Sequence, residues 1–241
     1  MLQRSARPRR SNMNVRLVSY TKPTEEFVQE GIKDNDLLDL VAFCARVSNP
    51  ANQINSETSE RLVKYLIKHA HWSPLEMVNL CLEIDTTRDI AHQIVRHRSF
   101  AFQEFSQRYA EPGQMGEEVF VTSEARLQDT KNRQNSIEID LDGDPEMANI
   151  ITRWEELQQD VIYTAGRAYD WAIQAGIAKE VARKVLPEGL TKTRLYMNGT
   201  LRSWVHYIDL RGANGTQKEH MEIAHACAKV IAEIFPLVEE L

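Results

Sequence analysis

A short run of alternating residues at positions 78–84 restricts the fold more than any other part of the sequence. The apolar side chains Val78, Leu80, Leu82 and Ile84 stand at every second position, which places them on one face of a β-strand. The segments on either side of this run have apolar residues three and four apart, the spacing of a helix that buries one face. The pattern predicts a sheet with one apolar face, covered by helices.

Similar patterns assign most of the remaining chain. Strands are predicted at 15–20 and 193–200, with a further possible strand at 119–122. Helices are predicted at 36–47, 57–69, 147–175, 179–186 and 201–211, and a last long helix follows residue 216. Capping-box patterns are expected to begin the helix after Thr86 and Asp89 and the helix after Thr216 and Glu219. Together these elements predict an α+β fold, a small and mostly antiparallel sheet flanked by long helices.

No linker or internal repeat divides the sequence, so residues 13–241 are expected to form a single domain. Residues 1–12 differ in composition, because they contain Arg4, Arg7, Arg9 and Arg10 with no acidic residue. We expect a disordered basic tail there. A short organellar presequence, or an upstream start before Met13, would have the same composition.

The charge of the chain limits the class of ligand. The formal net charge is −6, which disfavours a general nucleic-acid binder whose affinity rests on excess positive charge. Between Arg88 and Arg108, however, four arginines and two histidines face only Asp89 and Glu104. This local excess suits a small anionic ligand. No apolar run approaches the length of a membrane span, so no membrane partner is expected.

The three cysteines give no sign of a disulfide framework. Cys44, Cys81 and Cys227 are odd in number and far apart, which fits a reducing, cytoplasmic setting. Each has apolar neighbours, so a buried thiol is favoured over a nucleophile. His69 and His71 lack a third ligand at a zinc-like spacing, and we expect no metal site.

Two further segments allow more than one interpretation. Residues 126–136 are polar and read either as a solvated excursion or as a lid over a ligand. In the last helix, Ile223, Cys227, Val230 and Ile234 form a stripe that would serve either the core or a subunit interface.

Residues 96–109 mix basic, aromatic and hydroxyl side chains in a way that an ordinary surface segment does not require. The basic residues Arg96 to Arg98 are expected in the last turn of a helix, where cations complement the helix dipole. Arg108 and Ser106 lie beyond that helix, and Phe100, Phe102 and Phe105 can turn inward to anchor the loop. Guanidinium groups, a hydroxyl and an imidazole on one loop suit a phosphate and a planar heterocycle.

Read as Arg96-His97-Arg98, seven residues and Ser106, this stretch resembles the signature of the flavin-dependent thymidylate synthases. Three more segments resemble that family in the same order. They are His71-Trp-Ser-Pro-Leu-Glu76, the helix end from Arg183 to Leu186-Pro187, and Arg202-Ser203 followed by Arg211. The resemblance covers roughly residues 13–235.

The resemblance implies reductive methylation of dUMP to dTMP. The carbon would come from 5,10-methylenetetrahydrofolate, the electrons from NADPH, and FAD would carry them. It also implies a homotetramer in which FAD sites are shared between subunits.

By motif position, the resemblance assigns residues to two ligands. The expected FAD contacts are Ser73, Arg96, His97, Arg98, Glu104, Arg202 and His206, with His71 near flavin and folate. The expected dUMP contacts are Gln93, Arg96, Ser106, Gln107, Arg108 and Arg183, with Arg211 against the uracil ring as the catalytic residue.

The residue types suit this chemistry. A guanidinium near N3 and O4 of uracil would stabilise the anion that develops when C5 becomes a nucleophile, which is the role expected of Arg211. Arg108 and Arg183 offer bidentate contacts to a phosphate. The alternative is a non-catalytic nucleotide- or nucleic-acid-binding module, in which Phe100, Phe102 and Phe105 would stack on bases.

Overall fold

The computed structural model describes residues 13–34, 36–116, 118–140 and 145–240. The predicted tail, 1–12, lies outside these ranges. In the described part, the main sheet has four antiparallel strands in the order β1-β2-β6-β3. Its strands are β1 (Asn14–Tyr20), β2 (Asn79–Thr87), β3 (Ala101–Glu104) and β6 (Lys192–Thr200), and β4 (Arg126–Gln128) pairs with β5 (Ser136–Glu138) in a separate hairpin.

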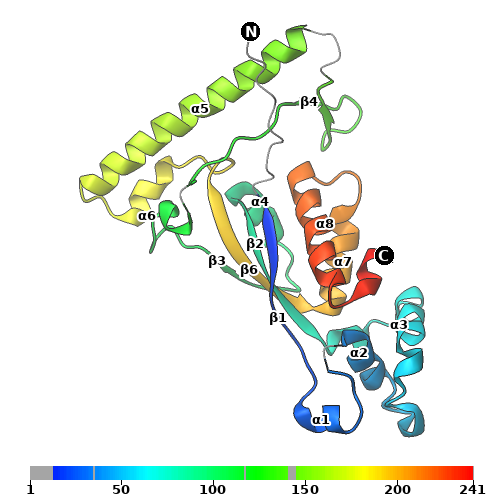
Figure 1. Cartoon of the computed structure of the whole chain (residues 1–241). Helices are drawn as coiled ribbons and strands as arrows, with labels where there is room; N and C mark the ends of the chain where they lie inside the picture. Colours follow the sequence, from blue (N-terminus) through cyan, green and yellow to red (C-terminus); the bar gives the residue numbers. More distant parts are fainter. Residues whose placement is uncertain (1–12, 35, 117, 141–144, 241) are drawn as a thin grey trace, which may run out of the picture.

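The helices are arranged around this sheet, with α7 and α8 beside it and α2 and α3 beyond one end of the strands (Figure 1). The α-helices are α1 (Glu25–Gln29), α2 (Leu37–Ala45), α3 (Ser59–Lys68), α4 (Arg88–Ile94), α5 (Pro145–Gln174), α6 (Lys179–Ala182), α7 (Leu201–Gly212) and α8 (Lys218–Ala232). Short 3₁₀ turns are η1 (Pro50–Asn52), η2 (Ser56–Thr58), η3 (Ser73–Glu76), η4 (Pro112–Met115), η5 (Arg183–Val185) and η6 (Pro236–Glu240).

The predicted α+β architecture is confirmed, and so is the alternating strand on which it rested. Leu80, Leu82 and Ile84 of β2 are fully buried and belong to one core with apolar residues of α2, α3, α4, α7 and α8. Removing such side chains from water is the main favourable contribution to folding. Ile223 and Cys227 are also fully buried there, so the first part of the α8 stripe serves the core.

The basic stretch at 96–109 differs from its prediction in two ways. Helix α4 ends at Ile94, so Arg96, His97 and Arg98 lie in the turn after the helix and not in its last turn. The residues after that turn form the edge strand β3, paired with β6. Its four residues are too few to show an alternating pattern, which explains why sequence periodicity missed it.

Other local predictions need correction. Residues 119–122 form only an isolated bridge, Phe120 with Thr191, and the predicted helix at 179–186 is divided between α6 and η5. Residues 126–136 lie largely in the β4–β5 hairpin. Neither predicted capping box forms: Thr87 and Gln217 occupy the N-cap positions of α4 and α8, and neither side chain accepts a capping hydrogen bond.

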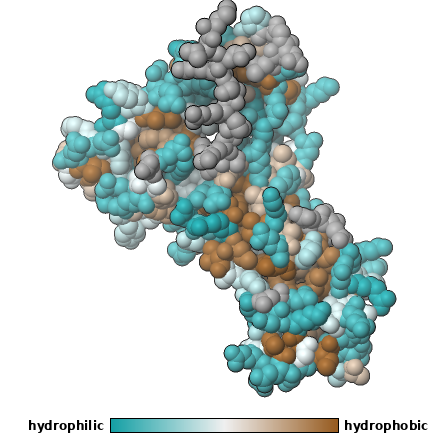
Figure 2. All heavy atoms as spheres, in the orientation of Figure 1, coloured by the Kyte–Doolittle hydropathy of each residue, from teal (hydrophilic) through white to brown (hydrophobic). Residues whose placement is uncertain are grey.

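Helix α5 runs along one end of the molecule, at a distance from the main sheet (Figure 1). Several of its large apolar side chains remain accessible, among them Trp154, Leu157, Val161 and Trp171. Figure 2 shows apolar patches over the central body and at both ends of the molecule, separated by hydrophilic side chains. Among the described residues, no helix combines the length and apolarity needed to cross a membrane.

Candidate active site

The turn after α4 is fixed to the core by one aromatic side chain. The His97 amide donates to the Ile94 carbonyl at 3.1 Å, and the Phe100 amide donates to the His97 carbonyl at 3.2 Å. Phe100 is only 9% exposed and packs edge-on against Trp204, with ring centroids 4.9 Å apart. Burial of Phe100 therefore anchors the turn, as the sequence predicted, and removes this ring from any role as a stacking platform for bases.

A glycine on the neighbouring strand makes this burial possible. A Cβ atom at Gly199 of β6 would clash with the Phe100 ring. The absence of a side chain at this position lets the ring lie against the strand backbone, a close approach that often explains a glycine inside a strand.

The turn brings His97 to the last turn of α7, where Arg211 lies. The Arg211 Nε donates a hydrogen bond to His97 Nε2 at 2.9 Å. Because an acceptor nitrogen carries no proton, His97 is neutral and its proton is on Nδ1. Burial and the adjacent Arg211 charge both lower the pKa of His97. The pair therefore places one positive charge, that of Arg211, beside an uncharged imidazole.

Behind this pair lies a buried histidine that the sequence did not predict. His220 of α8 is fully buried, with Nδ1 3.3 Å from Gln93 Oε1 and Nε2 3.1 Å from the Tyr207 hydroxyl. Burial, with the Arg211 charge and His97, lowers the pKa of His220 to about 4. Gln93 in turn donates through Nε2 to Gln217 Oε1 at 2.7 Å. Sequence spacing contained no signal for His220, because its partners come from α4 and α7.

A second group of predicted residues lies where α7 packs against η3. Arg202 and His206 are one helical turn apart on α7. Arg202 contacts Glu76 at 3.1 Å, and His206 lies against the Trp72 ring with centroids 4.5 Å apart. Ser73 begins η3 and is exposed. The Nε atom of Arg202 is buried and has no hydrogen-bond partner within the described part of the chain.

His71 belongs to the backbone turn that leads into η3. Ala70 has the left-handed value φ 57°, which a non-glycine residue adopts at a cost. The His71 amide donates to the Leu66 carbonyl at 2.8 Å and completes the end of α3. The exposed imidazole lies edge-on to Tyr65, with ring centroids 6.0 Å apart.

A third group follows β3. Gln107 is 3% exposed, yet its Nε2 has no partner in the described structure. The exposed Arg108 points toward α6, with Nε 3.9 Å from a Glu180 carboxylate oxygen. Arg183, half-buried, follows α6 directly. Ser106 is half-buried at the start of this loop, and its carbonyl accepts the Tyr109 amide at 3.0 Å.

The comparisons with known proteins decide the family. Residues 32–237 match the family model described as thymidylate synthase complementing protein. The chain is 46% identical over 226 residues to a probable flavin-dependent thymidylate synthase of Paramecium bursaria Chlorella virus 1, covering 94% of this chain and 97% of the relative. The chain belongs to the flavin-dependent thymidylate synthase family.

Two further comparisons agree with this assignment. A flavin-dependent thymidylate synthase of Synechocystis is 45% identical over 227 residues, which cover 94% of this chain and 97% of the relative. The crystal structure of a UMP/dUMP methylase, PolB of Streptomyces cacaoi, bound with 5-Br dUMP, has a TM-score of 0.74 at 23% identity. It covers 96% of this chain and 94% of that chain. At that identity the likeness shows the shared fold.

Membership in the flavin-dependent thymidylate synthase family allows the three groups of residues to be compared with the motif-based predictions. Arg211, His97 and Gln93 come together in one cluster, whereas His71, Ser73, Arg202 and His206 gather around η3. Ser106 to Arg108 and Arg183 form the third group, near α6. None of the contacts described above joins the third group to the other two. The ligand roles of these residues remain predictions.

Glu104, predicted to contact FAD, is engaged with protein groups. Its Oε1 lies 3.2 Å from Arg88 Nη1 and accepts from the Thr193 hydroxyl at 2.9 Å. Arg96 and Arg98 extend from the turn after α4 as exposed side chains. Both arginines are therefore available to a ligand.

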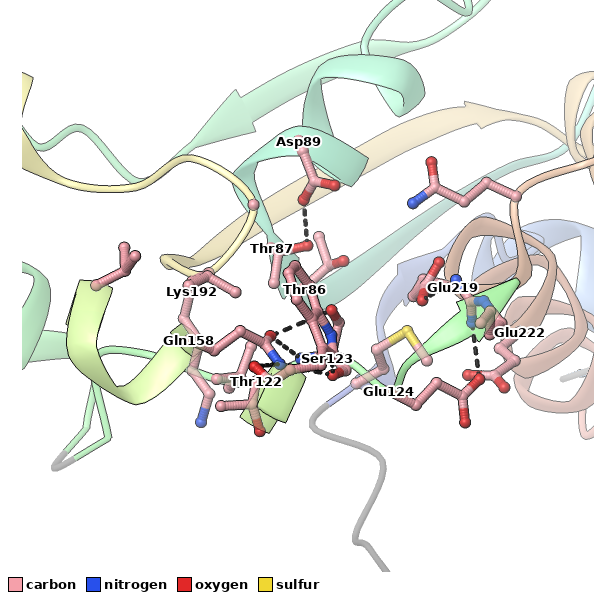
Figure 3. Close-up of a pocket in the computed structure, with 18 of the residues that line it drawn as sticks. Thr86, Thr87, Asp89, Thr122, Ser123, Glu124, Gln158, Lys192, Glu219 and Glu222 are labelled. Carbon is pink, nitrogen blue, oxygen red and sulfur yellow. Dashed lines mark hydrogen bonds and ion pairs between the residues drawn. The ribbon is translucent and has the colours of Figure 1, made fainter. Parts of the chain in front are cut away.

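A cavity of about 600 Å³ lies beside the cluster of Arg211, His97 and Gln93. None of the predicted site residues lines this cavity. Gln158 of α5 lies on one side of the cavity, and Glu219 and Glu222 of α8 lie opposite (Figure 3). Leu157 of α5 also lines it. Gln217 also lines this cavity and accepts the hydrogen bond from Gln93. The walls come from separate segments of the chain, which is why no sequence motif indicated the cavity.

Proposed function

We propose that this chain is an FAD-dependent thymidylate synthase that converts dUMP to dTMP, with 5,10-methylenetetrahydrofolate as carbon donor and NADPH as reductant. The family of the chain and the names of its relatives support the reaction. The observation that supports it within the molecule is the Arg211–His97 pair, a single guanidinium held by a neutral histidine at 2.9 Å.

In this proposal Arg211 acts on the uracil ring. Its Nε is held by His97, which leaves the two terminal amino groups of the guanidinium to lie at the N3/O4 edge of the base and donate to O4. Charge that develops on this edge as C5 becomes nucleophilic is stabilised by a cation already in place. A neutral His97 holds Arg211 without adding a second charge that would compete for the same oxygen.

The residues around η3 and in the turn after α4 would hold FAD. The buried Arg202 Nε without a partner fits a ligand that offers hydrogen-bond acceptors, such as the phosphates and ring carbonyls of FAD. Arg202, His206, Ser73 and His97 would bind the cofactor, with Arg96, Arg98 and Glu104 from the turn and β3. When bound, the flavin supplies the hydride chemistry.

The dUMP phosphate would lie in the third group, against Arg108, Arg183 and Ser106. Two guanidinium groups can each make bidentate contacts to a phosphate dianion. The unpaired Nε2 of the buried Gln107 supports this placement, because a buried donor without a partner is costly and an acceptor on the ligand would satisfy it.

A homotetramer with shared sites would bring these separated groups together. The apolar side chains Ile150, Leu157, Val161 and Trp171 lie along one side of α5 and remain 37%, 41%, 47% and 65% exposed. A stripe of this kind on a long helix is typical of a subunit interface.

The first experiment is the visible spectrum of the purified protein, which should show bound oxidised flavin. Protein that stays colourless after addition of FAD would contradict the proposal.

The second experiment measures dTMP formation by the variant Arg211→Ala. This variant should keep its flavin but form dTMP at least a hundredfold more slowly, because one transition-state charge contact is removed. Arg153→Ala, on the exposed surface of α5, is the control and should retain activity. Near-wild-type turnover in Arg211→Ala would exclude the proposed role.

A further inference from the structure

The buried imidazole of His220 connects three helices through its two ring nitrogens. Nδ1 faces Gln93 Oε1 of α4 at 3.3 Å, and Nε2 faces the Tyr207 hydroxyl of α7 at 3.1 Å. His220 itself is on α8 and is fully buried. A buried polar side chain with both donor and acceptor positions occupied is held in one orientation.

The chemistry of the partners determines where the proton is. The Gln93 Oε1 atom only accepts hydrogen bonds, so His220 Nδ1 must carry the proton that joins them. A neutral imidazole has a single proton, so Nε2 accepts from the Tyr207 hydroxyl. The ring stays neutral because it is buried beside the Arg211 charge, and its pKa is about 4. The hydrogen bonds therefore run in one direction, from Tyr207 through His220 to Gln93.

This direction determines what Gln93 offers to a ligand. Its carbonyl oxygen is occupied by His220, so its amino group is the part that faces outward. That group now donates to Gln217 Oε1 at 2.7 Å, at the exposed N-cap of α8. A ligand oxygen can replace Gln217 as the acceptor. Gln93 and Arg211 would then both present donors to the same ring.

We propose that His220 is a positioning residue, which holds the Gln93 amide as a hydrogen-bond donor and so favours a pyrimidine with oxygen at C4 over one with an amino group there. This inference rests on the proposed function, in which dUMP is the substrate and Arg211 acts on its uracil ring. Gln93, a predicted dUMP contact in the same cluster, would then donate to O4 of that ring. Uracil presents a hydrogen-bond acceptor, O4, to the Gln93 amino group. Cytosine has an amino group at the same position, so two donors would face each other and no hydrogen bond would form. The loss of this hydrogen bond discriminates against the wrong base.

The proton position can be tested without any ligand. In protein labelled with ¹⁵N-histidine, the nitrogen chemical shifts of a neutral imidazole distinguish Nδ1–H from Nε2–H, and the His220 signals are identified by their loss in His220→Asn. We expect the proton on Nδ1 at neutral pH. A proton on Nε2 would reverse the chain of hydrogen bonds, make Gln93 an acceptor, and overturn the proposal.

The base preference is tested by equilibrium binding of dUMP and dCMP to flavin-loaded protein. We expect His220→Phe to retain flavin and to reduce the dUMP-over-dCMP preference about tenfold, since one directed hydrogen bond is lost. His220→Asn keeps a donor near the position of Nδ1 and should retain most of the preference. Cys227→Ala, a buried change on the same helix without these hydrogen bonds, should retain all of it.

The outcomes separate this inference from the proposed function. If wild-type protein neither binds dUMP nor forms dTMP, the proposed function fails before any variant is compared. If wild-type protein prefers dUMP and a folded His220→Phe has the same preference, only the role of His220 fails. Should His220→Phe not fold, loss of the preference in His220→Asn counts against the proposal, and the proton position decides it independently.

Discussion

At the scale of single residues, the cluster around Arg211 combines one permanent charge with two imidazoles kept neutral. Burial lowers the pKa of His97 and His220, and the Arg211 charge lowers both further. Protonation of either ring would place a second positive charge near that of Arg211, and for the buried His220 the loss of hydration adds to the cost. This cluster should therefore respond to acid.

The first prediction concerns acid stability. The pKa of His220 is about 4 in the folded protein, against about 6.5 in an unfolded chain. As pH falls below 6.5 the unfolded chain takes up the proton first, so the contribution of His220 to stability is complete above that pH and is lost progressively down to pH 4. The full loss is about 3 kcal/mol. Urea unfolding of wild-type protein at pH 7.5 and pH 4.5 measures it.

Two variants show whether His220 causes this loss. His220→Phe lacks the titrating ring and should lose about 2 kcal/mol less than wild type over the same pH interval. Cys227→Ala retains the ring and should follow the wild-type pH dependence. Identical pH dependence in wild type and His220→Phe would show that other groups account for the acid response.

At the scale of elements, a glycine in one strand positions the turn after the neighbouring helix. Gly199 of β6 leaves room for Phe100, and Phe100 holds the turn that carries His97. The same turn follows α4, whose Gln93 is held by His220 of α8. Contacts from the strand and from the helices therefore both help to fix the turn.

The second prediction is that Gly199→Ala disturbs this site. The added methyl group overlaps the Phe100 ring, and overpacking of a filled core costs about 1–3 kcal/mol. We expect a lower unfolding midpoint in urea and a reduced flavin content after purification. Gly113→Ala is the matched control, because its added Cβ would meet only a Val119 methyl group at 3.9 Å. Wild-type stability and flavin content in Gly199→Ala would show that Phe100 does not hold the turn.

How far the elements could be predicted from sequence depended on their length. The strands β1, β2 and β6 and the helix α5 were predicted within a few residues, because each repeats its periodicity several times. The four residues of β3 repeat the two-residue strand period too few times to be recognised. This strand forms because β6 pairs with it. The hairpin β4–β5 was read as a polar loop for the same reason. It is joined to α8 by the ion pair Arg126–Glu219 at 2.6 Å, between residues far apart in sequence.

At the scale of the whole molecule, the residues matched to the family motifs are distributed over three separate groups, and α5 carries an exposed apolar stripe. Both observations favour an assembly in which the site is completed by other copies of the chain. The cavity beside Gln217 shares Leu157 and Val161 with the stripe, so association through α5 would also change that cavity.

The third prediction tests this assembly. A carboxylate on the stripe, in Trp171→Glu or Leu157→Glu, should convert a tetramer into smaller species, because an unpaired charge is costly in an apolar interface. Gln159→Glu adds the same charge to the opposite side of α5 and should leave the assembly intact. Native mass spectrometry at equal protein concentration measures the result. A wild-type monomer, or tetramers in all three variants, would contradict the role of the stripe.

The sequence by itself determined the class of fold, the core face of β2 and the family, because these depend on residue type and spacing along the chain. The resemblance to the family also predicted ligand roles, FAD contact for His97 and dUMP contact for Gln93 and Arg211, and these stay predictions. Only the tertiary structure decided how these side chains are held: Arg211 by His97, and Gln93 by His220. Those contacts join residues more than a hundred positions apart, and neither periodicity nor a local motif encodes which side chains meet when α4, α7 and α8 pack together.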